Sequence, residues 1–149
     1  MKKILSLVSV MLVISMLLIS CSFIGTQGNN DNSQAENQND IWTNALYQND
    51  IEIGEGAKTV QVEVKAGEKS VTFTIHTDKE TLGDALLEHN LIAGEKGAYG
   101  LYIKLVNGIE ADYDKDGTYW AFYKNGEMMM VGVDGAVIAD GEHYELIKE

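Results

Sequence analysis

The chain has 149 residues, enough for one domain of ordinary size and a tether, with 23 acidic residues against 11 lysines and no arginine. The net charge of −12 at pH 7 repels nucleic-acid phosphates and anionic lipids, so we expect no nucleic-acid partner. The lack of arginine also removes the side chain that binds phosphate in a bidentate way.

Residues 1–20 have the pattern of a secretory signal peptide. Lys2 and Lys3 give a positively charged start, and residues 4–19 are apolar apart from a few serines. This run is short for a membrane span and lacks a stop-transfer flank. We therefore expect residues 1–20 to be removed on export.

Cys21 is the predicted lipid anchor. Residues 18–21, Leu-Ile-Ser-Cys, match the bacterial lipobox, and the chain has no other cysteine. Two acyl chains on Cys21 would anchor the protein stably, since each buried CH₂ contributes roughly 0.8 kcal/mol. The predicted location is the extracytoplasmic face of the bacterial cell membrane. The alternative is an ordinary signal peptide that leaves Cys21 as a free thiol.

Residues 21–40 are predicted to be a disordered polar tether, because from Gly28 onward no apolar residue is larger than Ala35. Residues 41–57 follow as an N-terminal docking segment. Its apolar residues are spaced to share one helical face: Ile41, Trp42, Leu46 and Tyr47. A separate binding motif is the alternative interpretation of this segment.

The next part of the chain predicts a hairpin followed by a helix. Residues 59–65 alternate apolar and polar, and Val71, Phe73 and Ile75 do the same after a turn at residues 66–69. Thr81 predicts a helix N-cap with Asp84 three residues later. The apolar face of this helix would be Leu82, Ala85 and Leu86, with His89 as a further candidate, and Asn90 is the predicted stop.

Glycines at 94, 97 and 100 predict a loop before a strand at residues 101–106. Asn107-Gly108 and Asn125-Gly126 predict two hairpins, because both residues of such a turn take positive φ. Between them, residues 119–123 alternate as a strand with Trp120 and Phe122 on the core face. Further strands are expected at residues 136–138 and 144–147. The predicted class is α+β, a β-grasp-like mixed sheet of hairpins with one short helix packed on it.

These motifs together resemble the transcobalamin-like C-terminal domain family, also called domain of unknown function 4430, which is common in surface lipoproteins of Gram-positive bacteria. The resemblance covers residues from about Trp42 onward and assigns residues 58–149 to that domain. The motifs that carry it are Thr81-Leu-Gly-Asp-Ala-Leu86, Gly100-Leu-Tyr102, Val106-Asn-Gly108, Ala111-Asp-Tyr113, Tyr119-Trp120, Asn125-Gly126, Gly132-Val133 and Asp140-Gly141.

The resemblance implies a ligand site. In eukaryotic cobalamin carriers a Trp-containing strand precedes a loop whose apolar residues contact the corrin just before a glycine. Here Trp120, residues 127–131 and Gly132 match, and Met128, Met129 and Met130 supply the apolar loop. Those carriers clamp cobalamin against a large helical domain that this sequence lacks, so we expect weaker binding by the small domain alone.

The residues themselves leave two interpretations of the aromatic side chains open. One is a predicted platform for a ligand or partner, formed by Tyr102, Tyr119, Tyr123 and Met129. The other is simple packing against residues 41–47. Three consecutive methionines at a hairpin favour binding, because they cannot all be buried.

A calcium site is a second candidate. Asp112, Asp114 and Asp116 with Gly117 reproduce the first half of a D-x-D-x-D-G loop, but the twelfth position is Tyr123 instead of a bidentate Glu. An ordinary acidic turn is the favoured alternative. No nucleophile elbow and no metal-type histidine spacing occur, so we expect no enzymatic activity and no required cofactor.

The predicted function is a membrane-anchored extracytoplasmic lipoprotein that captures a soluble ligand, with cobalamin or a related cofactor as the named candidate, and passes it to a transporter. The alternative is a surface protein–protein interaction module with no small-molecule ligand.

Overall fold

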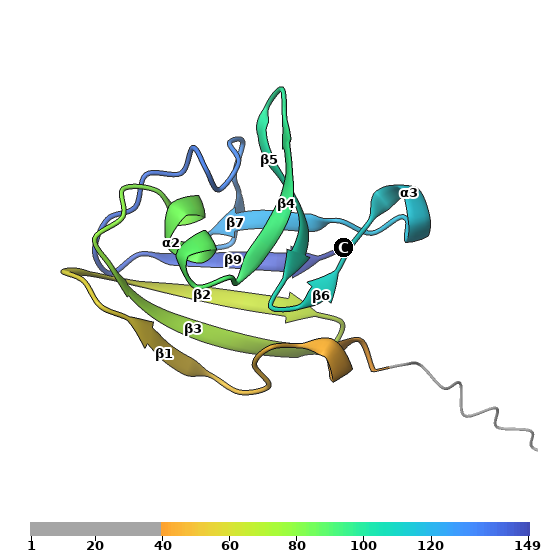
Figure 1. The fold of residues 1–149 in the computed structure, drawn as a ribbon, viewed down its shortest axis with the longest axis horizontal. Helices are drawn as coiled ribbons and strands as arrows, with labels where there is room; N and C mark the ends of the chain where they lie inside the picture. Colours follow the sequence, from red (N-terminus) through yellow and green to blue (C-terminus); the bar gives the residue numbers. More distant parts are fainter. Residues whose placement is uncertain (1–39) are drawn as a thin grey trace, which may run out of the picture. The chain divides into compact units, whose positions relative to one another are not determined.

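A six-stranded mixed sheet runs through residues 40–149, the part of the chain that this computed structural model describes. Its strands in spatial order are β1 (Ile51–Gly54), β3 (Lys69–Thr77), β2 (Lys58–Ala66), β9 (His143–Lys148), β7 (Trp120–Lys124) and β8 (Glu127–Met128). The parallel pair β2 and β9 lies at the centre of the sheet (Figure 1), as expected for the β-grasp-like arrangement. The predicted signal peptide, Cys21 and tether residues 21–39 lie outside the described residues.

The β2–β3 hairpin forms as the alternation predicts. Val62 pairs with Phe73, and the inward-facing residues of both strands are at most 1% exposed. Burying each such side chain contributes roughly 1.5–3 kcal/mol. β1 was not predicted: its four residues are only half-buried or exposed, so they lack the pattern of a buried strand, and β1 pairs in parallel with β3.

Helix α2 (Leu82–Glu88) begins and ends where the sequence predicts. The Thr81 hydroxyl accepts a hydrogen bond from the Asp84 amide at 3.2 Å, and Asn90 adopts a φ of 54° after the last turn. Leu82, Ala85 and Leu86 are buried in the core as predicted. The helix therefore presents one apolar face to the sheet.

The predicted loop at residues 94–100 is wrong. Residues Ile92–Gly97 form strand β4, which pairs with β5 (Gly100–Val106), and β5 continues into β6 (Ile109–Glu110) through the Asn107-Gly108 turn. At Gly94 the register shifts, and a Cβ there would lie 2.0 Å from the Tyr102 carbonyl oxygen. Glycine at this position thus permits a close strand pairing at a bulge.

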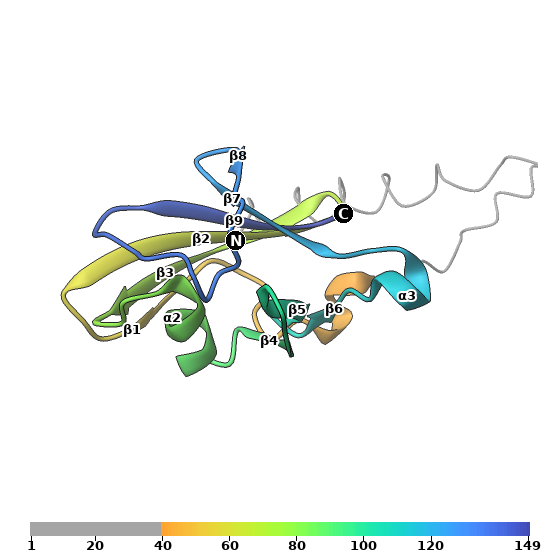
Figure 2. The same cartoon turned by 90° about the horizontal axis from the view of Figure 1, so that it is seen from above.

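The second sheet and α2 cover one face of the six-stranded sheet, as the view from above shows (Figure 2). The opposite face is covered by no other element among residues 40–149. Trp120 and Phe122 point into the core, at 7% and 8% exposed.

No helix within the described range is long and apolar enough to span a membrane.

The N-terminal segment begins with a 3-10 helix, η1 (Ile41–Asn44), capped by the Asp40 carboxylate. The Trp42 side chain is 2% exposed, and its indole nitrogen donates to the Ala66 carbonyl at 2.9 Å. The shared helical face predicted for this segment is wrong, because Ile41 and Leu46 are 42% and 56% exposed. Trp42 and the half-buried Tyr47 instead contact the core from an irregular segment.

Candidate functional site

The predicted platform residues do not form one surface. Tyr119 and Tyr123 lie on the uncovered face of the six-stranded sheet, and Met128 stands directly opposite Tyr123 across the strands. Tyr102 belongs to the second sheet, whereas Met129 is half-buried and packs against the core. Trp120 is in the core itself.

A carboxylate holds the two tyrosines in place. The hydroxyl groups of Tyr119 and Tyr123 donate to Glu149 at 2.8 and 2.7 Å. The hydrogen bond to Glu149 raises the pKa of both hydroxyls above the ordinary value. These rings therefore belong to a polar, internally bonded surface that Met128 borders, whereas Met129 packs against the core instead.

A different apolar surface is formed by two loops. We define the apolar rim as Tyr99, Met130 and Val131, which are 101%, 93% and 50% exposed. Tyr99 lies at the turn of the β4–β5 hairpin, and the other two residues belong to the loop that follows β8. The loops are adjacent: a Cβ on Gly132 would lie 3.9 Å from the Leu101 carbonyl oxygen and 4.0 Å from that of Tyr99.

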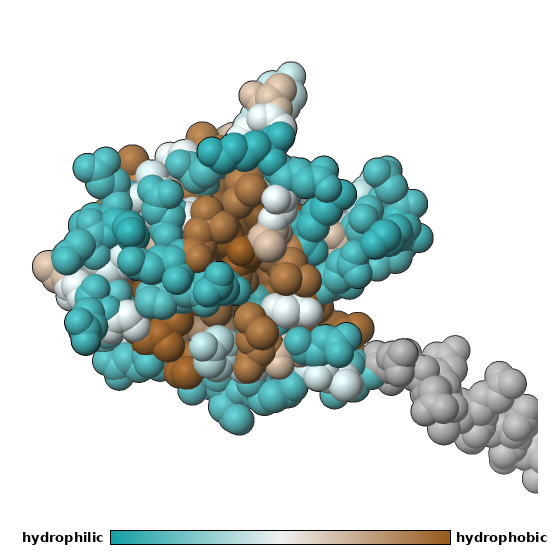
Figure 3. Space-filling model, in the orientation of Figure 1, coloured by the Kyte–Doolittle hydropathy of each residue, from teal (hydrophilic) through white to brown (hydrophobic). Residues whose placement is uncertain are grey.

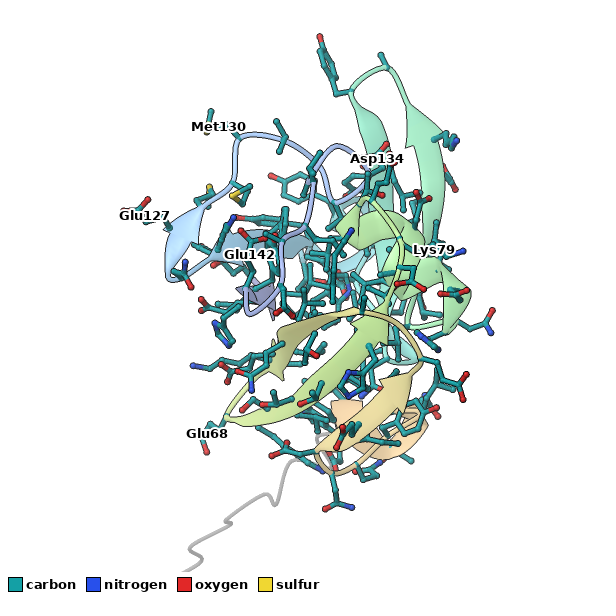
Figure 4. All side chains as sticks on the ribbon, turned by 90° about the vertical axis from the view of Figure 1, so that its left-hand side faces the viewer. Glu68, Lys79, Glu127, Met130, Asp134 and Glu142 are labelled. Atoms are coloured by element: carbon teal, nitrogen blue, oxygen red, sulfur yellow. The ribbon has the colours of Figure 1, made fainter. Side chains whose placement is uncertain are left out.

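The loop after β8 is held at several points. The Met129 amide donates to the Phe122 carbonyl, and Asp134 accepts a hydrogen bond from the Leu101 amide at 3.1 Å. Helix α2 binds the same loop, because the Gly83 amide donates to the Val133 carbonyl at 2.8 Å. Figure 4 shows Met130 at the outer end of this loop and Asp134 where the loop meets the β4–β5 hairpin. The exposed side chains thus stand on an anchored backbone.

The chain that leads from this loop to β9 is anchored by Glu142. Its carboxylate accepts hydrogen bonds from Lys124, Tyr144 and the Ala139 amide. Burial opposes ionisation, but these hydrogen bonds outweigh it and lower the pKa of Glu142 to about 2. Burial and the hydrogen bond to Glu142 raise the pKa of Tyr144.

A shallow hollow lies beside Tyr99, lined by residues 97–102 and therefore bordered also by Tyr102. Of the predicted ligand residues, Met130 is in the rim, Gly132 is the close-contact position between the two loops, and Tyr102 borders the hollow. Sequence reasoning missed Tyr99, and it included Val131 only as the last residue of the matched loop at residues 127–131. The run Gly97-Ala-Tyr-Gly100 could have revealed Tyr99, because a tyrosine between turn glycines stands at a hairpin tip.

The candidate calcium residues lie in and beside one helical turn, α3 (Tyr113–Asp116). The Asp112 carboxylate caps this turn by accepting from the Asp114 amide and lies 3.7 Å from the Lys115 ammonium. Asp116 accepts two hydrogen bonds from Thr118, which lower its pKa. Among residues 40–149 no three His, Cys, Asp or Glu side chains are arranged to hold a metal ion.

The fold and the exposed loops define the class of protein first: a small β-grasp-like domain with an apolar rim at one end. Residues 79–143 match the family described as "Domain of unknown function (DUF4430)". One similar protein of known crystal structure comes from Ruminococcus gnavus ATCC 29149 and has a name that suggests metal binding. Its sequence is 34% identical to that of this chain, and the two structures superpose with a TM-score of 0.59. That match covers 62% of this chain and 97% of the other.

The chain belongs to the DUF4430 family. Haptocorrin, solved in complex with Cbi, shares the fold at 19% identity and a TM-score of 0.53. The match covers 65% of this chain but only 26% of haptocorrin. No curated protein matches the sequence.

Proposed function

We propose that this protein captures cobalamin or a related cofactor on the apolar rim, while a lipid on Cys21 holds it at the extracytoplasmic face of a bacterial membrane. A transporter in that membrane would receive the ligand. The observation that carries the proposal is the exposure of Tyr99 and Met130 on anchored loops. The two loops that carry these side chains are neighbours, and neighbouring exposed apolar groups mark candidate interaction sites.

The rim suits a ligand with a flat apolar face. Only a shallow hollow borders Tyr99, so the rim contacts a ligand from one side. Methionine adapts to irregular surfaces, and a tyrosine ring offers a rigid apolar plane at low entropic cost. The structure of haptocorrin in complex with Cbi, about a quarter of which shares this fold, supports the choice of a corrinoid as the candidate ligand.

The test is a visible-absorption titration of the full-length chain in detergent with cobalamin. We expect a spectral change that saturates, and an affinity at least about tenfold weaker in Tyr99→Ser/Met130→Ser, because central apolar contacts dominate small interfaces. Tyr119→Ser on the uncovered sheet face is the matched control and should bind as the native chain does. A flat titration at high micromolar cobalamin would remove the corrinoid proposal.

A second candidate, a protein–protein interaction module, is favoured by another apolar area. Figure 3 shows hydrophobic surface on the side that carries α2 and β4, where α2 contributes Leu87 at 44% exposed. In this case a membrane protein should co-purify without corrinoid, and Leu87→Asp should abolish its capture while Tyr119→Asp should not. Capture that survives Leu87→Asp would count against this candidate.

Metal binding, which the name of the Ruminococcus relative suggests, finds no support in the described residues. Near α3, the Asp112 and Asp116 carboxylates bond to nearby amides and lysines. We therefore propose no metal for this chain.

A further inference from the structure

Asp134 lies where three segments of the chain meet. Its carboxylate accepts a hydrogen bond from the Leu101 amide on β5, and the carbonyl group of the preceding residue, Val133, accepts one from Gly83 in α2. The loop that carries Met130 thereby contacts both the helix and the hairpin that carries Tyr99. Asp134 is the side chain that links the two halves of the rim.

Three glycines surround Asp134, one from each segment. A Cβ at Gly100 would lie 2.6 Å from the Oδ1 atom of Asp134, and one at Gly132 would lie 2.8 Å from it. A Cβ at Gly83 would lie 2.9 Å from the Asp134 backbone. Real Cβ atoms essentially never approach so closely, so any other residue at these positions would displace Asp134. All three segments leave space for this one residue.

We propose that Asp134 is a positioning residue that fixes the spacing between Tyr99 and the Met130–Val131 loop. This inference rests on the proposed ligand capture at the rim. Asp134 acts through the Leu101 amide and does not touch the ligand. Its effect is to present the two loops as one preformed surface, which lowers the ordering cost of binding.

A purely structural role for Asp134 would lower the stability of the domain and leave the ligand affinity of the folded protein unchanged. Asp134 is exposed, and one exposed hydrogen bond contributes about 1 kcal/mol or less to folding. Its loss should therefore lower the Tm of the domain by only a few degrees and leave the domain folded. Ligand affinity should fall as well, because it depends on the spacing of the rim loops.

The experiment compares Asp134→Ala with Asp134→Asn in the full-length chain. Asparagine keeps an oxygen that can accept from the Leu101 amide, so it should rescue the role, whereas alanine removes the acceptor. We expect Asp134→Ala to speed hydrogen exchange at the Leu101 amide by about fivefold, the equivalent of one lost hydrogen bond. Cobalamin affinity should fall about tenfold in Asp134→Ala and stay near native in Asp134→Asn.

The positioning role would be overturned by unchanged Leu101 exchange in Asp134→Ala, or by native cobalamin affinity in that variant. An Asp134→Asn variant as impaired as Asp134→Ala would also count against it, since charge and not position would then matter. If the native chain binds no cobalamin while Leu101 exchange responds as expected, the capture proposal fails and the hold of Asp134 on the hairpin is supported. The two failures are therefore distinguishable.

Discussion

The β2–β3 and β4–β5 hairpins have the same architecture but differ in how many of their side chains are buried. In β2–β3 every second side chain is buried, from Val60 to Ala66 and from Val71 to Thr77. In β4 only Ile92 is buried, and the turn that follows exposes Tyr99 completely. The first hairpin buries a whole face in the core, whereas the second buries only Ile92, Ile103 and Val106 and leaves its turn exposed. A strand side chain that faces no neighbouring layer remains available for contact with another molecule.

The largest expected loss of stability comes from removing a buried aromatic ring, and removal of an exposed ring is the comparison. Phe73 is fully buried and packs edge to face on Tyr47 at 5.6 Å between ring centroids. Phe73→Ala should lower the free energy of unfolding by about 3–5 kcal/mol, because it leaves a cavity. Tyr102→Ala on β5 should change it by less than about 0.5 kcal/mol. Urea denaturation measures both, and similar losses would contradict the contrast.

A smaller effect is expected at Glu142, which anchors the chain between the rim loop and β9. Glu142→Gln should cost about 1–3 kcal/mol at pH 7, because the hydrogen-bonded charge is lost. The folded pKa of about 2 lies below the ordinary 4.5, so this stabilisation is complete above pH 4.5 and is lost as pH falls toward 2.

Denaturation of native chain and Glu142→Gln from pH 7 to pH 2 measures this difference. The two stabilities should converge as the pH falls. A difference that stays constant over this range would show that the charge of Glu142 has no part in the stabilisation. Glu145→Gln, on the uncovered face of the same strand, is the matched control and should show a smaller difference.

Within the exposed β4–β5 hairpin, the two glycines of β4 should differ in how much stability an added methyl group costs. Gly94→Ala would place a methyl group against the Tyr102 carbonyl, whereas Gly97→Ala meets nothing nearer than 3.7 Å. We expect Gly94→Ala to cost about 1–3 kcal/mol through overpacking and Gly97→Ala to be nearly neutral. Thermal unfolding of the two variants measures this, and equal Tm values would refute the steric account of the bulge.

The smallest effect is expected from calcium. Two of the three candidate carboxylates are already engaged: that of Asp112 by the Asp114 amide, and that of Asp116 by Thr118 and Lys148. Millimolar CaCl₂ should therefore shift the Tm by less than about 1 °C, because a ligand stabilises only a state that binds it. MgCl₂ at the same ionic strength is the control. A calcium-specific rise of several degrees would restore the calcium site.

Elements whose signal is local were predictable from sequence. Both Asn-Gly turns adopt φ values of 51° and 78° at Asn and Gly, as the hairpin rule requires. The alternation of β2 and β3 and the Thr81 cap are local in the same sense, since periodicity and capping depend on nearby residues. The α+β class followed from these elements alone.

Features that depend on distant partners were not predictable. β1 and β4 have no alternating burial, and each becomes a strand only because a neighbour is available to pair with it. The placement of the predicted platform residues on two different sheets was not predictable for a related reason. Glu149, which binds Tyr119 and Tyr123, follows them by 26 residues or more, and no local pattern reveals that contact.

The central position of β9 also bears on how the protein is made. Its residues pair with β2 on one side and β7 on the other. The β2–β9 ladder, which begins with the pair Gln61 and His143, therefore cannot form until β9 is present. A chain threaded from its N-terminus through a secretion channel would emerge with β2 and β3 long before their central neighbour. In such a chain the sheet could close only once residues 143–148 were available to pair, and their removal would split the sheet at its middle.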